Sequence, residues 1–217
     1  MTSFNRRKFL SCAAALPLSL YLPINSHAAS AGSKKRLSGI IHELEGDVFI
    51  NKNIANSSSI IKSGNLISVA YGGRLLFSMG EDTYLLQEGS SLQIESRDNV
   101  IVSGLRLLTG GLLAVFGTRQ YSTKIHTRTA TIGIRGTGVY LNSQPEKLYF
   151  CTCYGNTDLN LNHHHTEQIQ STHHKAFEIS GHSEKTMSMK ATQVLGHTDE
   201  ELRLLEQYSG RKPLFDL

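Results

Sequence analysis

The side chains best suited to metal or redox chemistry lie in the last third of the chain. Cys151 and Cys153 are separated by one residue, and seven of the ten histidines follow them. These histidines are His163, His164, His165, His173, His174, His182 and His197. Cysteine sulfur and imidazole nitrogen are the usual ligands of structural zinc, which binds four of them tetrahedrally. The segment therefore predicts a metal centre, with zinc as the expected cofactor.

The spacing of the two cysteines limits what they can do. Side chains two residues apart on a strand share a face, so both sulfurs could reach one ion. A disulfide across one residue would close a small, strained ring, and strained bridges are easily reduced. A metal site and a reversible redox pair both fit this spacing. A third interpretation is a buried apolar pair with unrelated surface histidines.

The expected metal ligands are Cys151, Cys153, one of His173 and His174, and His197. Neighbouring histidines point in different directions, so only one of the pair should bind. His197 directly precedes a predicted helix, which would fix its position, whereas His163–His165 fits a solvated loop. The stretch from Tyr154 to that helix has little apolar content, and a metal's binding free energy would add to its folding free energy.

The sequence offers little for catalysis. It contains no recognisable nucleophile turn or oxyanion loop, and no Cys-x-x-Cys-His motif for covalent haem. The glycine-rich run from Ile132 to Gly138 lacks a following phosphate-loop lysine. We therefore expect no enzymatic activity, with thiol redox chemistry at Cys151 and Cys153 as the alternative.

The elements that must position these residues are mainly strands. Apolar runs recur about every eight residues between Gly39 and Leu161, separated by turn residues. They are Leu66–Val69, Arg74–Phe77, Thr83–Leu86, Ser91–Ile94 and Asn99–Val102. This spacing predicts a mainly β fold, a sandwich, barrel or solenoid of short strands.

Three local patterns add detail. Gly110 and Gly111 separate two apolar runs, which predicts a tight hairpin. Between Ala130 and Arg135 apolar and other residues alternate, which predicts a strand with one buried face. Thr198 and Glu201 form a Thr-x-x-Glu capping box, which predicts a C-terminal helix over 199–209.

The N-terminus predicts export. Residues 1–28 combine a basic start, a modestly apolar stretch and small residues at a cleavage site after Ala28. The segment from Asn5 to Ser11 resembles a twin-arginine signal, and an ordinary secretory leader is the alternative. Residues 29–38 are expected to be a flexible segment in a periplasmic protein.

Charge and hydropathy exclude two kinds of partner. The formal charge is +4, and without residues 1–28 the chain has 19 basic and 18 acidic residues. Such a balance carries no basic footprint for nucleic acid. No apolar run reaches 18 residues, so we expect no membrane span.

An ordered set of motifs resembles the FecR domain, a periplasmic module named after a ferric-citrate sensing regulator. The motifs are Gly46–Ile50, Glu88–Leu92, Leu108–Gly111 and Ile134–Val139, and the resemblance covers about residues 40–143. It implies a β-rich sandwich or solenoid with a binding or signalling role. The regulator's anti-sigma segment and membrane helix have no counterpart in this sequence.

The resemblance completes the predicted organisation. Residues 39–161 form the FecR-like β domain, and 162–217 form a His-rich extension with the helix. The extension resembles that of some exported FecR-like proteins through Phe150–Gly155, His173–His174 and His197–Asp199. We expect a non-enzymatic binding or signalling module whose partner is an unknown protein or small ligand of the cell envelope. An envelope scaffold is a further alternative.

Overall fold

The computed structural model describes residues 38–97, 101–118, 123–161, 165–181 and 187–217. All of them belong to one of two compact units, Lys34–Leu217. The predicted leader and residues 29–37 lie outside the described residues, as do His163, His164 and His182. Ser38, expected in the flexible segment, is instead the first residue of a strand.

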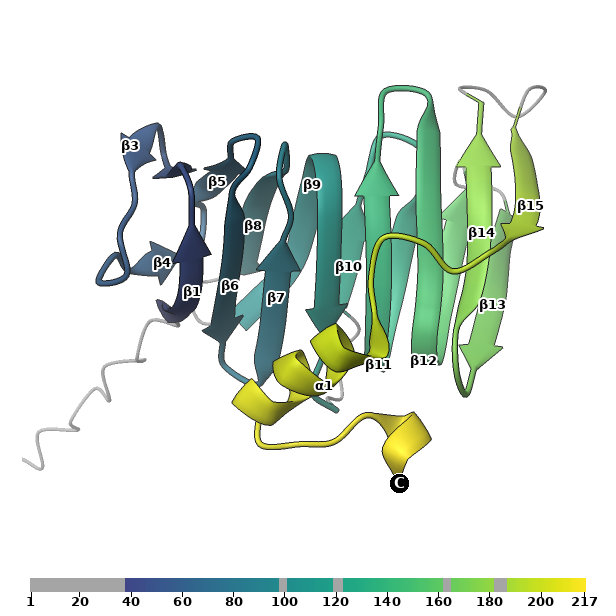
Figure 1. Cartoon of the computed structure of the whole chain (residues 1–217). Helices are drawn as coiled ribbons and strands as arrows, with labels where there is room; N and C mark the ends of the chain where they lie inside the picture. Colours follow the sequence, from purple (N-terminus) through teal and green to yellow (C-terminus); the bar gives the residue numbers. More distant parts are fainter. Residues whose placement is uncertain (1–37, 98–100, 119–122, 162–164, 182–186) are drawn as a thin grey trace, which may run out of the picture. The chain divides into compact units, whose positions relative to one another are not determined.

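Fifteen strands among the described residues form one continuous sheet (Figure 1). They are β1 (Ser38–Glu45), β2 (Val48–Ile50), β3 (Asn53–Ile54), β4 (Ile61–Lys62), β5 (Leu66–Val69), β6 (Arg74–Met79), β7 (Asp82–Leu86), β8 (Ser91–Arg97), β9 (Ile101–Val115), β10 (Thr123–His126), β11 (Thr131–Ser143), β12 (Lys147–Leu161), β13 (His165–Ser171), β14 (Lys175–Ser180) and β15 (Ser188–Thr192).

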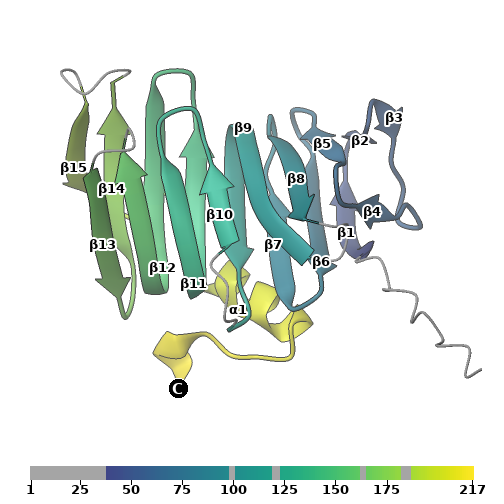
Figure 2. The same cartoon turned by 180° about the vertical axis from the view of Figure 1, so that it is seen from behind.

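The sheet folds into two layers that share three long strands. In the front layer of Figure 1 the order is β1-β6-β7-β9-β11-β12-β14-β15. The back layer, seen in Figure 2, has the order β3-β2-β5-β8-β9-β10-β11-β12-β13. Strands β9, β11 and β12 bend and take part in both layers. The predicted mainly β fold is confirmed, although these three strands have 13 to 15 residues and are not short.

The bends explain why the predicted hairpin at Gly110 is wrong. Gly110 has a φ of 81° inside β9, whose first part pairs with β8 and whose last part pairs with β7. Glycine adopts this left-handed conformation without strain, so it turns the strand through a corner instead of reversing it. Gly155 does the same in β12 with a φ of 88°, and a Cβ there would clash with Thr137 Cγ2.

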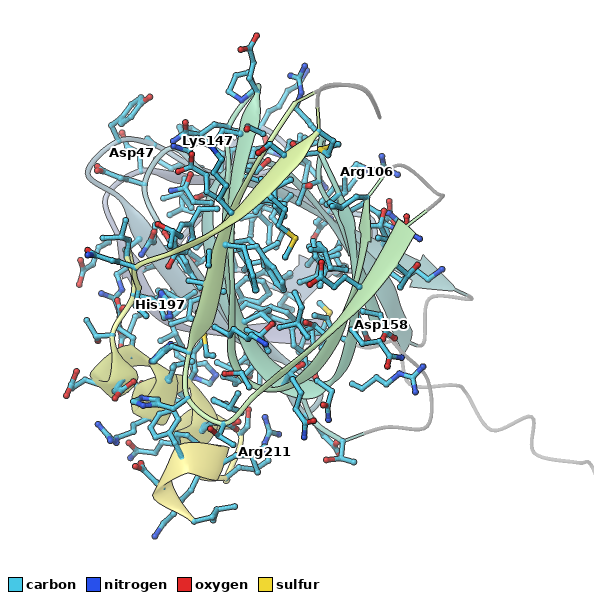
Figure 3. The ribbon with its side chains drawn as sticks, turned by 90° about the vertical axis from the view of Figure 1, so that its right-hand side faces the viewer. Asp47, Arg106, Lys147, Asp158, His197 and Arg211 are labelled. Carbon is cyan, nitrogen blue, oxygen red and sulfur yellow. The ribbon has the colours of Figure 1, made fainter. Side chains whose placement is uncertain are left out.

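Alternation along the strands produces two separate groups of buried side chains. The inner core lies between the layers (Figure 3) and includes Leu75, Phe77, Leu112, Leu148 and Phe150. The outer cluster lies on the other face of the front layer. Its members are Leu76, Leu85, Leu113, Val115, Tyr140, Cys151, Cys153, Tyr154, Ala176, Leu202 and Leu205. Successive residues of one strand thus enter different groups, as a period of two requires.

The C-terminal segment covers the outer cluster. Helix α1 (Asp199–Tyr208) packs against β7 and β9 and buries Leu202 and Leu205. Its Thr198–Glu201 capping box is present, so the predicted helix and cap are confirmed, with Ser209 as the C-cap. Tyr208, the last residue of the same helix, stacks on His42 of β1, with ring centroids 4.0 Å apart. A short 3-10 helix, η1 (Leu214–Asp216), follows.

Several local predictions agree with the observed strands. The apolar runs at Leu66, Arg74, Thr83 and Ser91 begin or lie in β5, β6, β7 and β8. Ile132 and Ile134 of β11 are buried and alternate with more exposed neighbours, as predicted. The boundary predicted at residue 161 lies between β12 and β13, which pair with each other. No helix in the described part of the chain is long and apolar enough to cross a membrane.

Candidate metal centre

Two cysteines of β12 form the base of the candidate centre. Both are fully buried on the outer face of the front layer, where Cys151 lies opposite Tyr140 of β11 and Ala176 of β14. Their shared face follows from the spacing of two along the strand. Both are free thiols. The strand therefore presents two sulfurs side by side towards the C-terminal segment.

His174 approaches the sulfurs from the turn before β14. Its backbone N–H donates to Cys153 O at 2.7 Å, which fixes the turn against β12. Its φ is 50°, a left-handed conformation that is uncommon for a residue with a side chain. Such backbone strain tends to occur at functional sites, where the surrounding structure enforces it. The ring is directed inward, with its Nδ1 3.7 Å from Cys151 Sγ.

His197 approaches from the strap, the segment 193–198 that joins β15 to α1. Its ring stacks on Tyr140 with centroids 4.7 Å apart and is only 8% exposed. Two hydrogen bonds hold the strap on the sheet: Gln87 Nε2 donates to Gly196 O at 2.6 Å, and Leu195 N donates to Tyr149 Oη at 2.9 Å. His197 therefore has a fixed position above the two sulfurs.

The four inward atoms have the separations of a tetrahedral site. Zinc bond lengths in that geometry place two nitrogens about 3.3 Å apart, and sulfur and nitrogen about 3.6 Å apart. His197 Nε2 lies 3.2 Å from His174 Nδ1 and 3.3 Å from Cys153 Sγ, and the Cys151–His174 contact is 3.7 Å. All four atoms lie within 4.8 Å of one another. The donor set and its dimensions fit one zinc ion.

Hydrogen bonds on the far side of each ring fix which nitrogen is free. His197 Nδ1 lies 3.1 Å from Leu195 O, and His174 Nε2 lies 2.7 Å from an Asp199 carboxylate oxygen. Both partners can only accept, so both outer nitrogens carry the proton. In the neutral rings the two inner nitrogens then present lone pairs to each other. A cation between them removes this repulsion, and such outer partners are typical of metal-bound histidines.

Asp199 separates the roles of the two neighbouring histidines. His173 Nε2 lies 3.0 Å from Asp199 Oδ2, and its side chain is half exposed. It therefore lies outside the four-residue cluster, although His173, His174 and Asp199 form a second, more exposed group. Asp199 occupies the first position of α1, which the capping box holds in place.

The thiols respond differently to this environment. The neighbouring Cys153 thiol, followed by His197, lowers the pKa of Cys151, against the opposing effect of burial. Burial, followed by the neighbouring Cys151 sulfur, raises the pKa of Cys153 well above its ordinary value. The pair therefore loses one proton readily and holds the second. Two thiolates, two neutral imidazoles and one divalent cation would have no net charge, which suits a buried site.

Of the five predicted ligands, the structure brings together Cys151, Cys153, His174 and His197, and places His173 beside Asp199. Sequence reasoning missed Asp199 and Tyr140, which orient the two histidines. An acid in the first helical turn is ordinarily explained by the helix dipole, so there was little reason in the sequence to pair Asp199 with a histidine. The one available signal was the position of Asp199 two residues after His197, next to the helix cap.

The fold and site together define a two-layered β protein with a buried cysteine–histidine cluster. No family model matches the chain, and no curated protein matches it. Among solved structures, two crystal structures of a protein described as "a putative anti-sigma factor" from Parabacteroides distasonis ATCC 8503, at 1.65 and 2.50 Å resolution, are similar. Both give a TM-score of 0.49, with 11% and 10% identity. Each similarity covers 59% of this chain and 60% of the other.

Proposed function

We propose that this chain is an exported metal-binding β protein in which one zinc ion fastens the C-terminal segment to the sheet. The observation that carries the proposal is the approach of two imidazole nitrogens, 3.2 Å apart, above two buried sulfurs. The ligands come from β12, from the turn before β14 and from the strap. One ion at this point would tie together segments up to 46 residues apart in sequence.

Metal analysis of matched variants tests this proposal. Wild-type protein purified without chelator should contain one zinc per chain, and His174→Ala should contain almost none. His173→Ala is the matched control: the His173 ring contacts Asp199 and lies outside the four-residue cluster, so the zinc content of this variant should stay near one per chain. Cobalt replacement should give the visible spectrum of tetrahedral thiolate coordination. Metal-free wild type after incubation with zinc, or equal content in both variants, would rule out the centre.

The wider role that we propose is binding or signalling in the cell envelope. It is supported by the ordered motifs that resemble the FecR domain and by the mainly β fold. The partner would be a protein or small ligand outside the cytoplasm. The metal would then serve to hold a recognition surface in shape, with no catalytic task.

Export itself is part of the proposal and has a separate test. It is supported by the Arg6-Arg7 pair and by the small residues before the expected cleavage site after Ala28. The mature protein should begin at Ala29 in the periplasm. The double substitution Arg6→Lys with Arg7→Lys should leave it in the cytoplasm, as fractionation and immunoblotting would reveal. Normal export of the double variant would contradict the twin-arginine route.

A thiol redox role is the second candidate, favoured by the lowered pKa of Cys151. The complete burial of both sulfurs is unfavourable for it, because reactive thiols are usually partly exposed. Thiol counting separates the two functions. A metal-free protein whose two thiols oxidise and reduce reversibly would support the redox role.

A further inference from the structure

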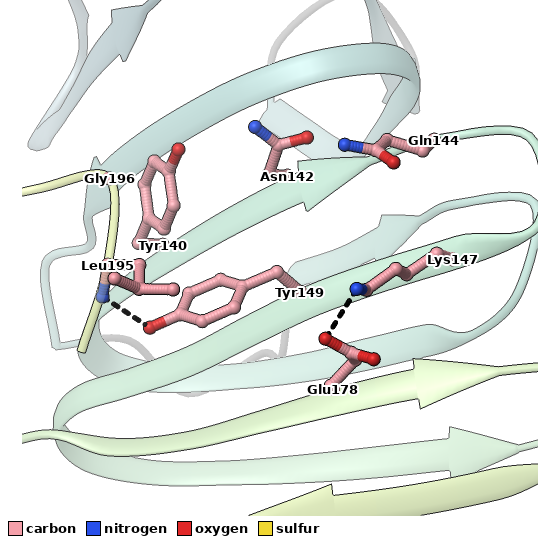
Figure 4. Close-up of a pocket in the computed structure, with 8 residues that line it drawn as sticks. All are labelled: Tyr140, Asn142, Gln144, Lys147, Tyr149, Glu178, Leu195 and Gly196. Atoms are coloured by element: carbon pink, nitrogen blue, oxygen red, sulfur yellow. Dashed lines mark hydrogen bonds and ion pairs between the residues drawn. The ribbon is translucent and has the colours of Figure 1, made fainter. Parts of the chain in front are cut away.

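A second site lies next to the candidate centre, on the same outer face of the front layer. It is a pocket of about 210 Å³ between the strap and the β11–β12 turn (Figure 4). The lining residues are Tyr140, Asn142, Gln144, Lys147, Tyr149, Glu178, Leu195 and Gly196. Nothing in the proposed metal chemistry uses this pocket. Its volume is suited to a single small ring or side chain.

Strand register places the lining side chains in rows. Asn142 of β11 pairs with Tyr149 of β12, which pairs with Glu178 of β14, so these three form one row across the layer. The next row contains Tyr140 and Cys151 and therefore borders the metal centre. On the other side Gln144 N donates to Lys147 O at 2.8 Å, which closes the strand turn. The floor of the pocket is thus fixed by the sheet.

The two tyrosines form a rigid aromatic pair, with Tyr140 buried and Tyr149 half-buried. Their rings meet edge to face with centroids 5.7 Å apart. Tyr149 Oη donates to Gln193 O at 3.0 Å, and Tyr140 Oη donates to Gln87 Oε1 at 2.7 Å. Both hydroxyls are therefore engaged with the protein. Tyr140 is only 2% exposed, so the ring surface that the pocket can offer a ligand is chiefly that of the half-buried Tyr149.

The charged groups at the opposite end neutralise each other. Lys147 Nζ lies 2.5 Å from Glu178 Oε2, and Figure 4 marks this ion pair by a dashed line. The pocket thus provides no unpaired charge for an anion or a cation. The remaining polar groups, Asn142 and Gln144, are amides, which both donate and accept hydrogen bonds. A hydroxyl group has the same dual character.

We propose that this pocket binds a neutral sugar ring, either free or at the end of a glycan. The Tyr149 ring would contact the C–H face of the sugar, and the amides of Asn142 and Gln144 would bind its hydroxyls. In an exported protein such a site would meet envelope carbohydrate. The proposal rests on the proposed function in two respects: export would bring the pocket to carbohydrate, and His197 holds the strap, which supplies Leu195 and Gly196 as a further wall.

Titration of the zinc-loaded wild-type protein tests the sugar site. The probes are methyl glucoside, N-acetylglucosamine and a soluble tetramer of N-acetylglucosamine. Binding would be monitored by saturation-transfer NMR and by the amide NMR signals of the protein. We expect saturable binding with shifts at the β11–β12 turn. Tighter binding of the tetramer than of its monomer indicates a glycan end, and equal binding indicates a free sugar.

Paired variants make the test specific. Gln144→Ala changes an exposed side chain, so folding should be unaffected, and it should weaken binding about fivefold or more, the loss expected for one or two hydrogen bonds. Asn142→Ala should do the same. Asn160→Ala, the same substitution on the back-layer part of β12, is the control and should have no effect. Non-saturable binding, or equal weakening by Asn160→Ala, would overturn the proposal.

The metal and sugar proposals can fail separately. If wild type contains no zinc but binds sugar in a Gln144-dependent way, the pocket remains and the metal centre is wrong. If zinc is present and no probe binds, the pocket proposal is wrong alone. If both proposals hold, His197→Ala should weaken sugar binding, because the strap wall is no longer held.

Discussion

The inner core and the outer cluster are built from the same strands but by different means. The inner core receives apolar side chains from both layers and is closed on both sides by sheet. The outer cluster has sheet on one side only and is covered by α1 and the strap. It contains two thiols and is bordered by two further buried polar residues, His197 and Glu206.

This difference determines which of the two regions depends on individual side chains. Many apolar side chains contribute to the inner core, so no single polar partner is required to hold it. The outer cluster depends on particular pairs, such as the Glu206 carboxylate with the Tyr154 hydroxyl and with Arg211 Nε at 2.7 Å. The outer cluster is therefore more easily disrupted by a single substitution than the inner core, since each buried polar group needs its partner.

The largest expected effect is in the inner core and should be independent of metal. Phe77 is fully buried and stacks on Tyr84, with centroids 5.0 Å apart. Phe77→Ala should lower the free energy of unfolding by about 3–5 kcal/mol, because it removes apolar contacts and leaves a cavity. Urea unfolding with and without chelator should give the same loss. A loss confined to the metal-loaded protein would break the distinction between the two regions.

Metal removal should act on the outer cluster alone. With free zinc at a hundred times the dissociation constant, chelation should lower the free energy of unfolding by about 2.7 kcal/mol. The circular dichroism of the sheet should persist below the melting transition, since no residue of the inner core is a ligand of the metal centre. The same chelator should leave His174→Ala unchanged. An effect of chelator on that variant would show that it acts elsewhere.

Asp199 should matter through His174 more than through the helix. Asp199→Asn weakens the acceptor that orients the ring, so zinc affinity should fall about 10- to 100-fold, the usual cost of losing an outer partner. Glu200→Gln also removes one acid from the first turn of α1 but contacts neither histidine, so it controls for the helix dipole. Competition with a chromophoric chelator would measure both variants. Equal losses would assign the effect to the helix.

A smaller, pH-dependent effect is expected at Glu206. Burial raises the pKa of its carboxyl above the ordinary value, against the opposing influence of Tyr154 and Arg211. Its stabilising contribution is therefore complete below the unfolded pKa of about 4.3 and decreases as pH rises towards the folded pKa. The stability of wild type relative to Glu206→Gln should decline over that window, by at most about 1.4 kcal/mol per pH unit.

Parallel titrations of thermal stability would check this sign. Glu200→Gln serves as the control, because Glu200 is an exposed acid of the same helix. A relative stability of wild type that rises with pH would mean that the carboxylate form is the favoured one. In that case Arg211 would stabilise the Glu206 carboxylate by more than burial destabilises it.

Local patterns predicted the strands and the helix because those patterns depend on neighbours in sequence. Turn residues bounded β5 to β8, and the Thr198–Glu201 box marked the start of α1. The prediction at Gly110 is wrong because a hairpin and a corner within one strand both use glycine. The two differ only in which strands the flanking residues pair with. Here the partners are β8 before Gly110 and β7 after it, and local sequence does not reveal that pairing.

For the site, the sequence narrowed the candidates without choosing among them. It favoured Cys151, Cys153 and His197, but could not choose between His173 and His174. That choice depends on the left-handed backbone at His174 and on the position of Asp199. Both are consequences of how the strap and helix lie on the sheet. The pocket beside the strap had no sequence signal, since its residues come from three strands and two connections.

The three strands that belong to both layers have a consequence for unfolding. Because β9, β11 and β12 each continue from one layer into the other, neither layer can lose its central strands alone. The two layers should therefore open as one cooperative unit, with similar amide hydrogen-exchange protection in both halves of each shared strand. Fraying would instead begin at the ends, at β3 and β15. The strap, which follows β15, would then detach before the sheet that carries it.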